Sequence, residues 1–296
     1  MDVSVIIVNY NTVQLTQKCI ESVVKTTEGL DYEIVLVDNA SRDGSVEKFS
    51  QDSRIKFIQS DTNLGFGKAN NLGLHHSTGK YIFFLNSDTL LLNNAIKLFY
   101  DFMEANGTAL NVGAVGTLLM DANEERAHSY SKLPTIGDFF KAEWGDHILK
   151  RFGKRMPRYD ENVTDPDRPY FPVGYVTGAD LFCARRTIEQ CGAFDPDFFM
   201  YSEESEMQFR WKKHNLNSYI LRGPQIIHLE GASQKKMSVS KSFMTLRSQL
   251  LYFKKTSPRW EYYIYRILLL VSRLLTLPMQ KLTCEERREY LRIITR

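Results

Sequence analysis

The segment of this sequence with the clearest chemical potential spans residues 80–89 (KYIFFLNSDT). Its five consecutive apolar residues, Tyr81–Leu85, are too few for a globular helix and rich in aromatics, so they predict a buried strand. Asn86, Ser87 and Asp88 follow directly. A carboxylate with amide and hydroxyl neighbours can hold a hard divalent cation, which in turn binds phosphate oxygens. The same residue types are typical of a plain turn between a strand and a helix, so the interpretation needs support from the rest of the chain.

The elements before this segment have the pattern of an α/β protein. Strand and helix patterns alternate four times over about ninety residues, which favours a doubly wound α/β layer. The predicted strands are 3–8, 33–37, 55–59 and 81–85, and the predicted helices are 13–26, 46–52 and 68–76. Ligands of such sheets bind beyond the carboxyl ends of the strands, where Asp88 is expected.

The turn after the first strand excludes the common nucleotide-binding loops. It reads Asn-Tyr-Asn-Thr over residues 9–12, without the glycines of a dinucleotide-binding or P-loop motif. Thr12 is expected to cap the following helix. Asp38 ends the second strand, where an acid that binds ribose or base is often found. These features predict a nucleotide site in which a cation on Asp88, rather than a glycine-rich loop, neutralises the phosphates.

A second acidic cluster opens a helix predicted to end near residue 214. Ser202 is a natural N-cap, and the acids Glu203 and Glu204 in the first turn favour the helix dipole. With Glu206, however, there are three acids in four residues beside aromatic side chains at 198–201, more than a cap requires. Aromatic surroundings raise the pKa of a carboxylate, which suits a general base.

His228 follows a short predicted strand at residues 225–228. A single histidine in such a place usually has a structural role, but a neutral imidazole is also a ready metal ligand. Both interpretations stay open at this point.

Seven blocks of the chain, in order, resemble family 2 inverting glycosyltransferases of the GT-A fold, and more narrowly the rhamnosyltransferase-like bacterial branch. The blocks are 5–11 (VIIVNYN), 37–45 (VDNASRDGS), 63–71 (NLGFGKANN), 84–89 (FLNSDT), 177–179 (TGA), 194–204 (FDPDFFMYSEE) and 227–233 (IHLEGAS). The resemblance extends from about residue 3 to residue 233. It implies a GT-A catalytic domain over 1–234, with a nucleotide-sugar half at 1–120 and an acceptor half at 121–234.

The resemblance also implies a donor site for a nucleoside diphosphate sugar. The implied donor-binding residues are Asn9, Asn11, Asp38, Asn63, Gly65, Asn70, Ser87 and Asp88. The first three would line the base and ribose pocket, and the next three would lie near the ribose or the diphosphate. Asp88 and His228 would hold Mg²⁺ or Mn²⁺, a Lewis acid for the departing diphosphate.

Glu204 matches the family's general base, which takes the proton of the acceptor hydroxyl. Two departures from the family pattern affect this assignment. Asn86 replaces the first acid of the D-x-D-type motif, and the usual Glu-Asp pair is Glu203-Glu204 here, so Glu203 and Glu206 remain alternatives.

The acceptor would contact Gly178, Ala179 and Asp180. Asp180 stands where an apolar or small residue is expected. Its alternative role is an ion pair with Arg185 or Arg186.

The C-terminal section is strongly basic. Residues 235–281 contain ten Lys or Arg and one acid, a net charge of +9, whereas the whole chain carries +3. Residues 235–296 are expected to form basic amphipathic helices, and 237–278 a contact with a membrane surface in which Arg266 and Arg273 share one face of an apolar helix. The alternative is a helix packed on the catalytic domain or on a partner, with the arginines exposed.

The resemblance implies transfer of a sugar from dTDP-rhamnose or a UDP-hexose to a hydroxyl of a lipid-linked or oligosaccharide precursor of a cell-surface glycan. The alternative is a non-catalytic nucleotide- or glycan-binding subunit of a polysaccharide synthesis complex. The chain lacks nucleic-acid-binding motifs, and a homo-oligomer is possible. Without a signal peptide pattern or metal-type cysteine spacing, we expect a cytoplasmic protein, peripheral on the inner face of the membrane, with reduced cysteines.

Overall fold

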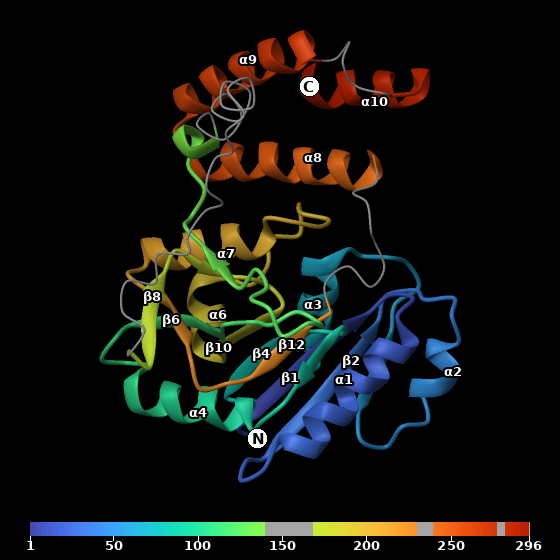
Figure 1. Ribbon diagram of the computed structural model, residues 1–296, viewed down its shortest axis with the longest axis vertical. Helices are drawn as coiled ribbons and strands as arrows, with labels where there is room; N and C mark the ends of the chain where they lie inside the picture. Colours follow the sequence, from blue (N-terminus) through green and yellow to red (C-terminus); the bar gives the residue numbers. More distant parts are fainter. Residues whose placement is uncertain (140–167, 230–238, 277–281, 296) are drawn as a thin grey trace.

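A mixed eight-stranded sheet forms the centre of the computed structural model, which describes residues 1–139, 168–229, 239–276 and 282–295 (Figure 1). The strand order is β3-β2-β1-β4-β10-β6-β11-β8. Its strands are β1 (Val3–Asn9), β2 (Tyr32–Asp38), β3 (Lys56–Gln59), β4 (Tyr81–Asn86), β6 (Val112–Thr117), β8 (Tyr170–Val173), β10 (Asp180–Ala184) and β11 (Asn217–Leu221). Strands β1 to β4 are parallel where they pair, and β10 is antiparallel to β4 and β6. This arrangement confirms the predicted mixed α/β fold.

Two layers of helices cover the two faces of the sheet. Successive side chains of a strand point to opposite faces, so a buried apolar strand contributes to a core on each side. In β4, Tyr81, Phe83 and Leu85 join the core under one layer, and Ile82 and Phe84 join the core under the other. The first layer contains α1 (Val13–Thr26), α2 (Ser45–Phe49) and α4 (Ala95–Asn106); the second contains α3 (Phe66–His75), α6 (Arg185–Cys191) and α7 (Glu203–Lys213).

The register of the parallel strands brings polar residues together at one edge of the sheet. Asn9 at the end of β1 lies opposite Asp38 at the end of β2, and Asn86 at the end of β4 lies opposite Val8. Two small sheets adjoin the main one. They pair β5 (Thr89–Leu91) with β12 (Ile226–His228), and β7 (Tyr130–Ser131) with β9 (Tyr175–Val176).

The helix caps expected at Thr12 and Ser202 are wrong in their side-chain chemistry. Thr12 precedes α1, but its hydroxyl bonds Asn9 Oδ1 at 2.9 Å, and Asp43 Oδ2 accepts the bond from the backbone N–H of Val13. Ser202 precedes α7 with a φ of 66° and makes no side-chain cap. At Thr12 a contact distant in sequence overrides the capping preference, and at Ser202 the local backbone conformation does so.

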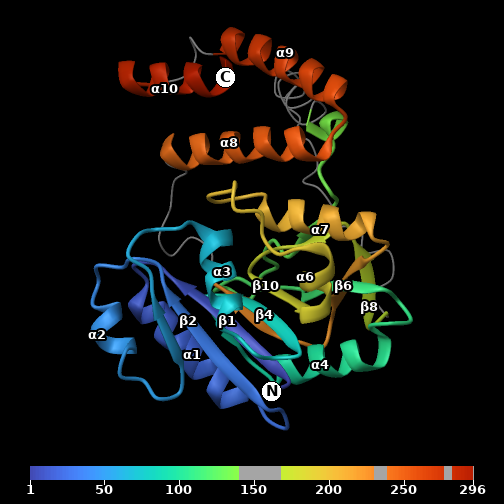
Figure 2. The same cartoon turned by 180° about the vertical axis from the view of Figure 1, so that it is seen from behind.

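Three C-terminal helices form a separate layer at one end of the molecule. They are α8 (Val239–Thr256), α9 (Arg259–Thr276) and α10 (Cys284–Thr295). In both views, α8 lies between α7 and the outer pair α9 and α10 (Figures 1 and 2). The predicted domain boundary at residue 234 lies outside the described residues. Within the described part of the chain, no helix combines the length and apolarity needed to cross a membrane.

The helical layer has a hydrophobic core that also includes residues from outside the three helices. Phe253 of α8 packs against Tyr265 of α9 and Phe139, and Phe198 belongs to the same cluster. All four cysteines are free thiols, as expected.

Candidate functional site

A pocket of about 440 Å³ opens beyond the carboxyl end of β4, where the sequence predicts a ligand site. Six of its lining residues were singled out in the sequence: Asn86, Gly178, Ala179, Glu203, Glu204 and His228. The pocket therefore brings the end of β4, the acceptor block and the acidic start of α7 around one cavity.

The small sheet of β5 and β12 places His228 beside Asp88. His228 pairs with Thr89 in this sheet, and the N–H of Leu229 donates to the carbonyl of Asp88 at 2.9 Å. As a result, His228 Nε2 lies 3.2 Å from Asp88 Oδ1 and 3.3 Å from Asn86 Nδ2. The structure thus joins two residues that are 140 positions apart in the sequence.

Asp88 and His228 together have a carboxylate oxygen and an imidazole nitrogen that can coordinate a cation, if a bound substrate supplies further ligands. His228 is almost fully buried, and its Nδ1 has no hydrogen-bond partner among the described residues. No group of three or more His, Cys, Asp or Glu side chains that could hold a metal occurs in the described part of the chain. A closed protein site is therefore not formed, but Mg²⁺ is commonly held by one or two carboxylates together with substrate phosphates. The residues present fit a cation of that kind.

The acidic start of α7 also lines the pocket. Glu203 is almost fully buried, and its Oε2 has no hydrogen-bond partner among the described residues. Burial raises the pKa of Glu203, and the nearby charge of Glu204 raises it further. Burial also raises the pKa of Glu204. Two carboxylates with raised pKa values in a cavity are typical of proton-transfer sites.

Of the three acids, Glu204 is nearest to the acceptor block. A Cβ built on Gly178 would lie 3.9 Å from the Cβ of Glu204, whereas Glu203 has its Cβ on the side of Gly67. Glu206 instead forms an ion pair with Arg210, which donates from Nε to Oε1 at 2.9 Å. The structure thus gives Glu206 a structural partner and leaves Glu203 and Glu204 facing the cavity.

Two of the predicted donor-binding residues have no exposed surface. Asn9 and Asp38 are both fully buried, and Asn9 Nδ2 donates to Asp38 Oδ1 at 2.8 Å. The hydroxyl of Ser41 accepts a second bond from Asn9, and the N–H of Ser41 donates to Asp38 Oδ2. In this structure the pair fixes the loop after β2 rather than lining an open pocket.

The loop residues next to this pair are more accessible. Asn11 is exposed with a φ of 55°, and its Oδ1 accepts from the N–H of Arg42 at 2.7 Å. Asn63 is half-buried and accepts from the side chain of Asn39 at 3.0 Å. Asn39 also accepts from the N–H of Leu64, so it joins the end of β2 to the loop before α3. Our sequence interpretation missed Asn39, although it lies in the 37–45 block.

The loop before α3 approaches the segment that leads into α7 at Gly65, and Asn70 lies in the first turns of α3. Gly65 has a φ of 78°, and a Cβ there would lie only 2.0 Å from the carbonyl oxygen of Phe199. The next N–H, of Phe66, donates to that same oxygen at 2.8 Å. Asn70 is buried and donates to the carbonyl of Phe66. Glycine is therefore required by the close approach of two pocket-forming loops.

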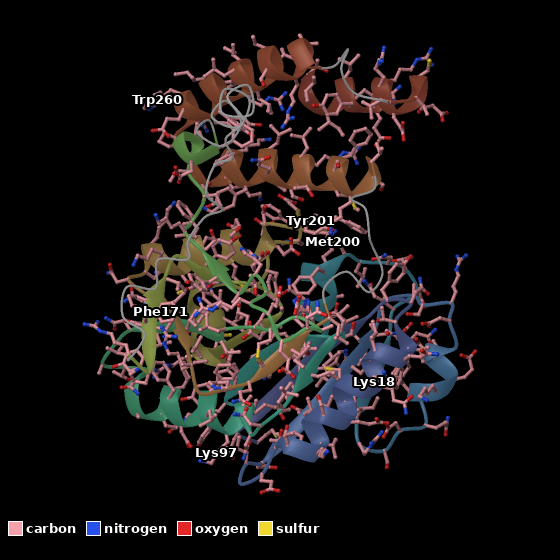
Figure 3. All side chains as sticks on the ribbon, viewed as in Figure 1. Lys18, Lys97, Phe171, Met200, Tyr201 and Trp260 are labelled. Atoms are coloured by element: carbon pink, nitrogen blue, oxygen red, sulfur yellow. The ribbon has the colours of Figure 1, made fainter. Side chains whose placement is uncertain are left out.

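The turn just before α7 has an uncommon backbone conformation. Tyr201 and Ser202 both have positive φ values, 75° and 66°. Such residues persist only where the surroundings impose them, and they concentrate at functional sites. The carbonyl of Met200 accepts a 2.6 Å bond from Ser248 of α8, so the C-terminal layer supports this turn (Figure 3).

Asp180 is not part of the pocket lining. Its side chain is fully buried in β10, where Oδ2 accepts from the N–H of Thr117 at 2.6 Å and Oδ1 has no partner among the described residues. The predicted alternatives are also wrong, because Arg185 donates to Ser77 and Gly79, and Arg186 lies by Thr108. Burial raises the pKa of Asp180 well above its usual value.

We expect Asp180→Asn to change the pH dependence of stability. Since the folded state raises the pKa of Asp180, the folded protein binds this proton more tightly, and the stability of the wild type falls as pH rises above the unfolded-state pKa of about 3.9. The loss is at most about 1.4 kcal/mol per pH unit. Asparagine does not titrate, so the variant loses less stability with rising pH. Urea unfolding from mildly acidic to mildly alkaline pH measures this, and parallel curves for the two proteins would contradict it.

Comparison with known proteins agrees with this geometry. Over 278 residues the chain is 24% identical to the low-salt glycan biosynthesis hexosyltransferase Agl10 of Haloferax volcanii, covering 90% of this chain and 82% of that protein. It is 39% identical over 181 residues to an uncharacterized glycosyltransferase of Rickettsia felis. That match covers 60% of this chain but only 29% of the much longer Rickettsia protein.

The crystal structure of Staphylococcus aureus TarS 1-349 has a similar fold. It matches with a TM-score of 0.55 at 15% sequence identity, covering 99% of this chain and 79% of that one. The fold is thus of the GT-A type. The family model for glycosyl transferase family 2 matches residues 4–161, more than half of the sequence. The chain is therefore a glycosyltransferase, and it belongs to glycosyl transferase family 2.

Proposed function

We propose that the protein transfers a sugar, with inversion at the anomeric carbon, from a nucleoside diphosphate sugar to a hydroxyl of a cell-surface glycan precursor. The observation that carries this proposal is one cavity whose lining includes Asn86, His228, Glu203 and Glu204. Side chains that can bind a phosphate-bridging cation and a side chain that can accept a proton are what such a transfer requires.

The donor would lie along the carboxyl edge of the parallel strands. Its nucleoside would contact the accessible loops at Asn11 and Asn63, and its diphosphate would reach Ser87 and Asp88. Asp88 and His228 would hold Mg²⁺ or Mn²⁺, which when bound supplies positive charge to the departing diphosphate. The buried pair Asn9–Asp38 would act by positioning these loops.

The chemical step follows from the position of the acids. The acceptor hydroxyl oxygen attacks the anomeric carbon, the bond from that carbon to the diphosphate oxygen breaks, and the hydroxyl proton passes to Glu204. Glu204 suits this role because it faces Gly178 and because burial raises its pKa, which makes its carboxylate a stronger base. Glu203, more deeply buried, would shape the environment of Glu204.

The donor is proposed as a UDP-hexose or dTDP-rhamnose, and the acceptor as a lipid-linked or oligosaccharide precursor. The Haloferax relative, named a hexosyltransferase of glycan biosynthesis, supports a hexose and a glycan product.

Calorimetric titration with UDP, dTDP and GDP, each with and without Mn²⁺, tests the donor site. We expect one nucleotide to bind clearly better than the others and to need the metal. Equal binding with and without Mn²⁺ would contradict the cation role of Asp88 and His228. Nucleotide binding without any hydrolysis or transfer of the matching sugar donor would instead support a non-catalytic binding subunit.

A further inference from the structure

The outer surface of α9 carries a continuous apolar stripe. Its members are between 38% and 65% exposed, and they recur at helical spacing: Trp260, Tyr263, Ile264, Ile267, Leu268, Val271 and Leu274. On the opposite face, Tyr265 and Leu269 are buried against α8 and α10. Apolar residues that are exposed singly on a protein surface do not usually line up along one face of a helix. Because α9 has buried one apolar face and exposes a second, its outer face is an unpartnered surface.

The basic residues of α9 do not lie on this stripe. Arg266 is half-buried and donates to the carbonyl of Ile294 in α10 at 3.1 Å, and Arg273 lines a cavity between the three helices. The arginines are therefore not exposed, as the alternative of a packed helix expected: they turn toward the helical layer, and the apolar residues turn outward. The stripe contains no charged residue.

Exposed positive charge lies at the start of α9 and on α10 instead. Arg259 is exposed next to Trp260, and Arg288 and Arg292 are exposed on α10, opposite its buried residues Tyr290 and Ile294. The described residues of α8, α9 and α10 contain ten Lys or Arg and four Glu, a net charge of +6. Two copies pairing through this surface would bring these positive charges together, whereas a negatively charged surface would be attracted.

We propose that the stripe of α9 lies on the surface of an anionic lipid bilayer, with α9 parallel to the membrane plane. Aromatic residues at one end of an apolar stripe and exposed arginines in the same helical layer suit an in-plane amphipathic helix. Trp260 lies at the left edge of the C-terminal helical layer, at the start of α9, and its side chain is exposed (Figure 3).

This contact also has a route to the pocket. Lys255 of α8 binds Asp195 and Asp197 at 2.7 and 2.6 Å, and Ser248 binds Met200. Both loop contacts precede the strained turn at Tyr201 and Ser202, which lines the pocket. The layer that contacts the membrane is thus the layer that holds one wall of the proposed active site, which suits an acceptor carried by a lipid.

Vesicle flotation of the full chain tests the proposal. Vesicles of phosphatidylcholine alone and of phosphatidylcholine with phosphatidylglycerol are compared for the wild type, Ile267→Glu and Leu98→Glu. Leu98 is an exposed leucine of α4, so it controls for the added charge and for the loss of an apolar surface residue. We expect the wild type to float with anionic vesicles, Ile267→Glu to bind at least about tenfold more weakly, and Leu98→Glu to bind like the wild type.

Two results would overturn the proposal. One is equal flotation of Ile267→Glu and the wild type. The other is a combination of two observations: no protein floats with either kind of vesicle, and light scattering shows a dimer of the wild type without lipid that Ile267→Glu dissociates. That result would assign the stripe to a second copy of the chain. Because these measurements need neither sugar nor nucleotide, their failure is separate from failure of the proposed transfer reaction.

Discussion

Asp88→Ala is expected to remove metal-dependent binding of the donor nucleotide and to lower kcat/KM by roughly 10²-fold or more, while the protein stays folded. Asp88 is only partly buried, and its carboxylate has His228 as its neighbour at 3.2 Å. Without it, the cation would keep one protein ligand from this pair, and the charge of the diphosphate would be poorly balanced. Calorimetry with and without Mn²⁺ and a donor-consumption assay measure the two effects.

Asp101→Ala is the matched control for this variant. Asp101 is an exposed aspartate of α4 that pairs only with Lys97 one helical turn earlier, and such surface pairs contribute about 0–1 kcal/mol. We expect this variant to bind nucleotide and metal as the wild type does. If Asp88→Ala keeps both metal-dependent binding and turnover, the assignment of Asp88 is wrong.

The fold could be predicted largely because its signals are local. The apolar runs of β1, β2 and β4 are nearly continuous, as expected for strands buried on both faces, and the helices between them fall close to the predicted ranges. The sequence TCEE at residues 283–286 also has the local pattern of a capping box, and the structure forms one: Thr283 Oγ1 accepts from the N–H of Glu286, and Glu286 Oε2 accepts from the N–H of Thr283.

The details of the site depend on contacts that no local pattern records. The distance between Asp88 and His228 is set by the pairing of β5 with β12, a three-residue ladder across some 140 positions of sequence. Asn39 and Asp43 act on loops far from them in the chain, so their roles become visible only after folding. Burial of Asp180 and Asn9 likewise depends on neighbouring strands, which the family resemblance that placed both residues near a ligand does not record.

The orientation of α9 is a further example. The periodicity of the sequence identified an amphipathic helix. In the structure this helix has three faces: apolar residues that pack inward, arginines on one side, and a second apolar stripe that faces outward. Only the position of α10 determines which side the arginines take. The sequence therefore predicted the amphipathic character of α9 without predicting which of its apolar residues face outward.

Glu204→Gln is expected to lower kcat by about 10²–10⁴-fold with little change in donor binding, because it removes the proposed proton acceptor and keeps the shape of the side chain. Glu203→Gln should change kcat much less, since the Cβ of Glu203 lies on the side of Gly67 rather than Gly178. Glu206→Gln is the control for a structural role. It weakens the pair with Arg210, so we expect a loss of about 1–3 kcal/mol in unfolding free energy without a comparable loss of kcat.

The pH dependence of the rate separates the base from its neighbours. Burial raises the pKa of Glu204, and a general base acts in its deprotonated form. The wild-type rate should therefore rise with pH through a pKa above that of an ordinary glutamate, and Glu204→Gln should lose this rise while keeping a low residual rate. The opposite result would be a low rate without pH dependence in Glu203→Gln, and a normal rate and pH dependence in Glu204→Gln. In that case Glu203 is the base, and Glu204 has only a positioning role.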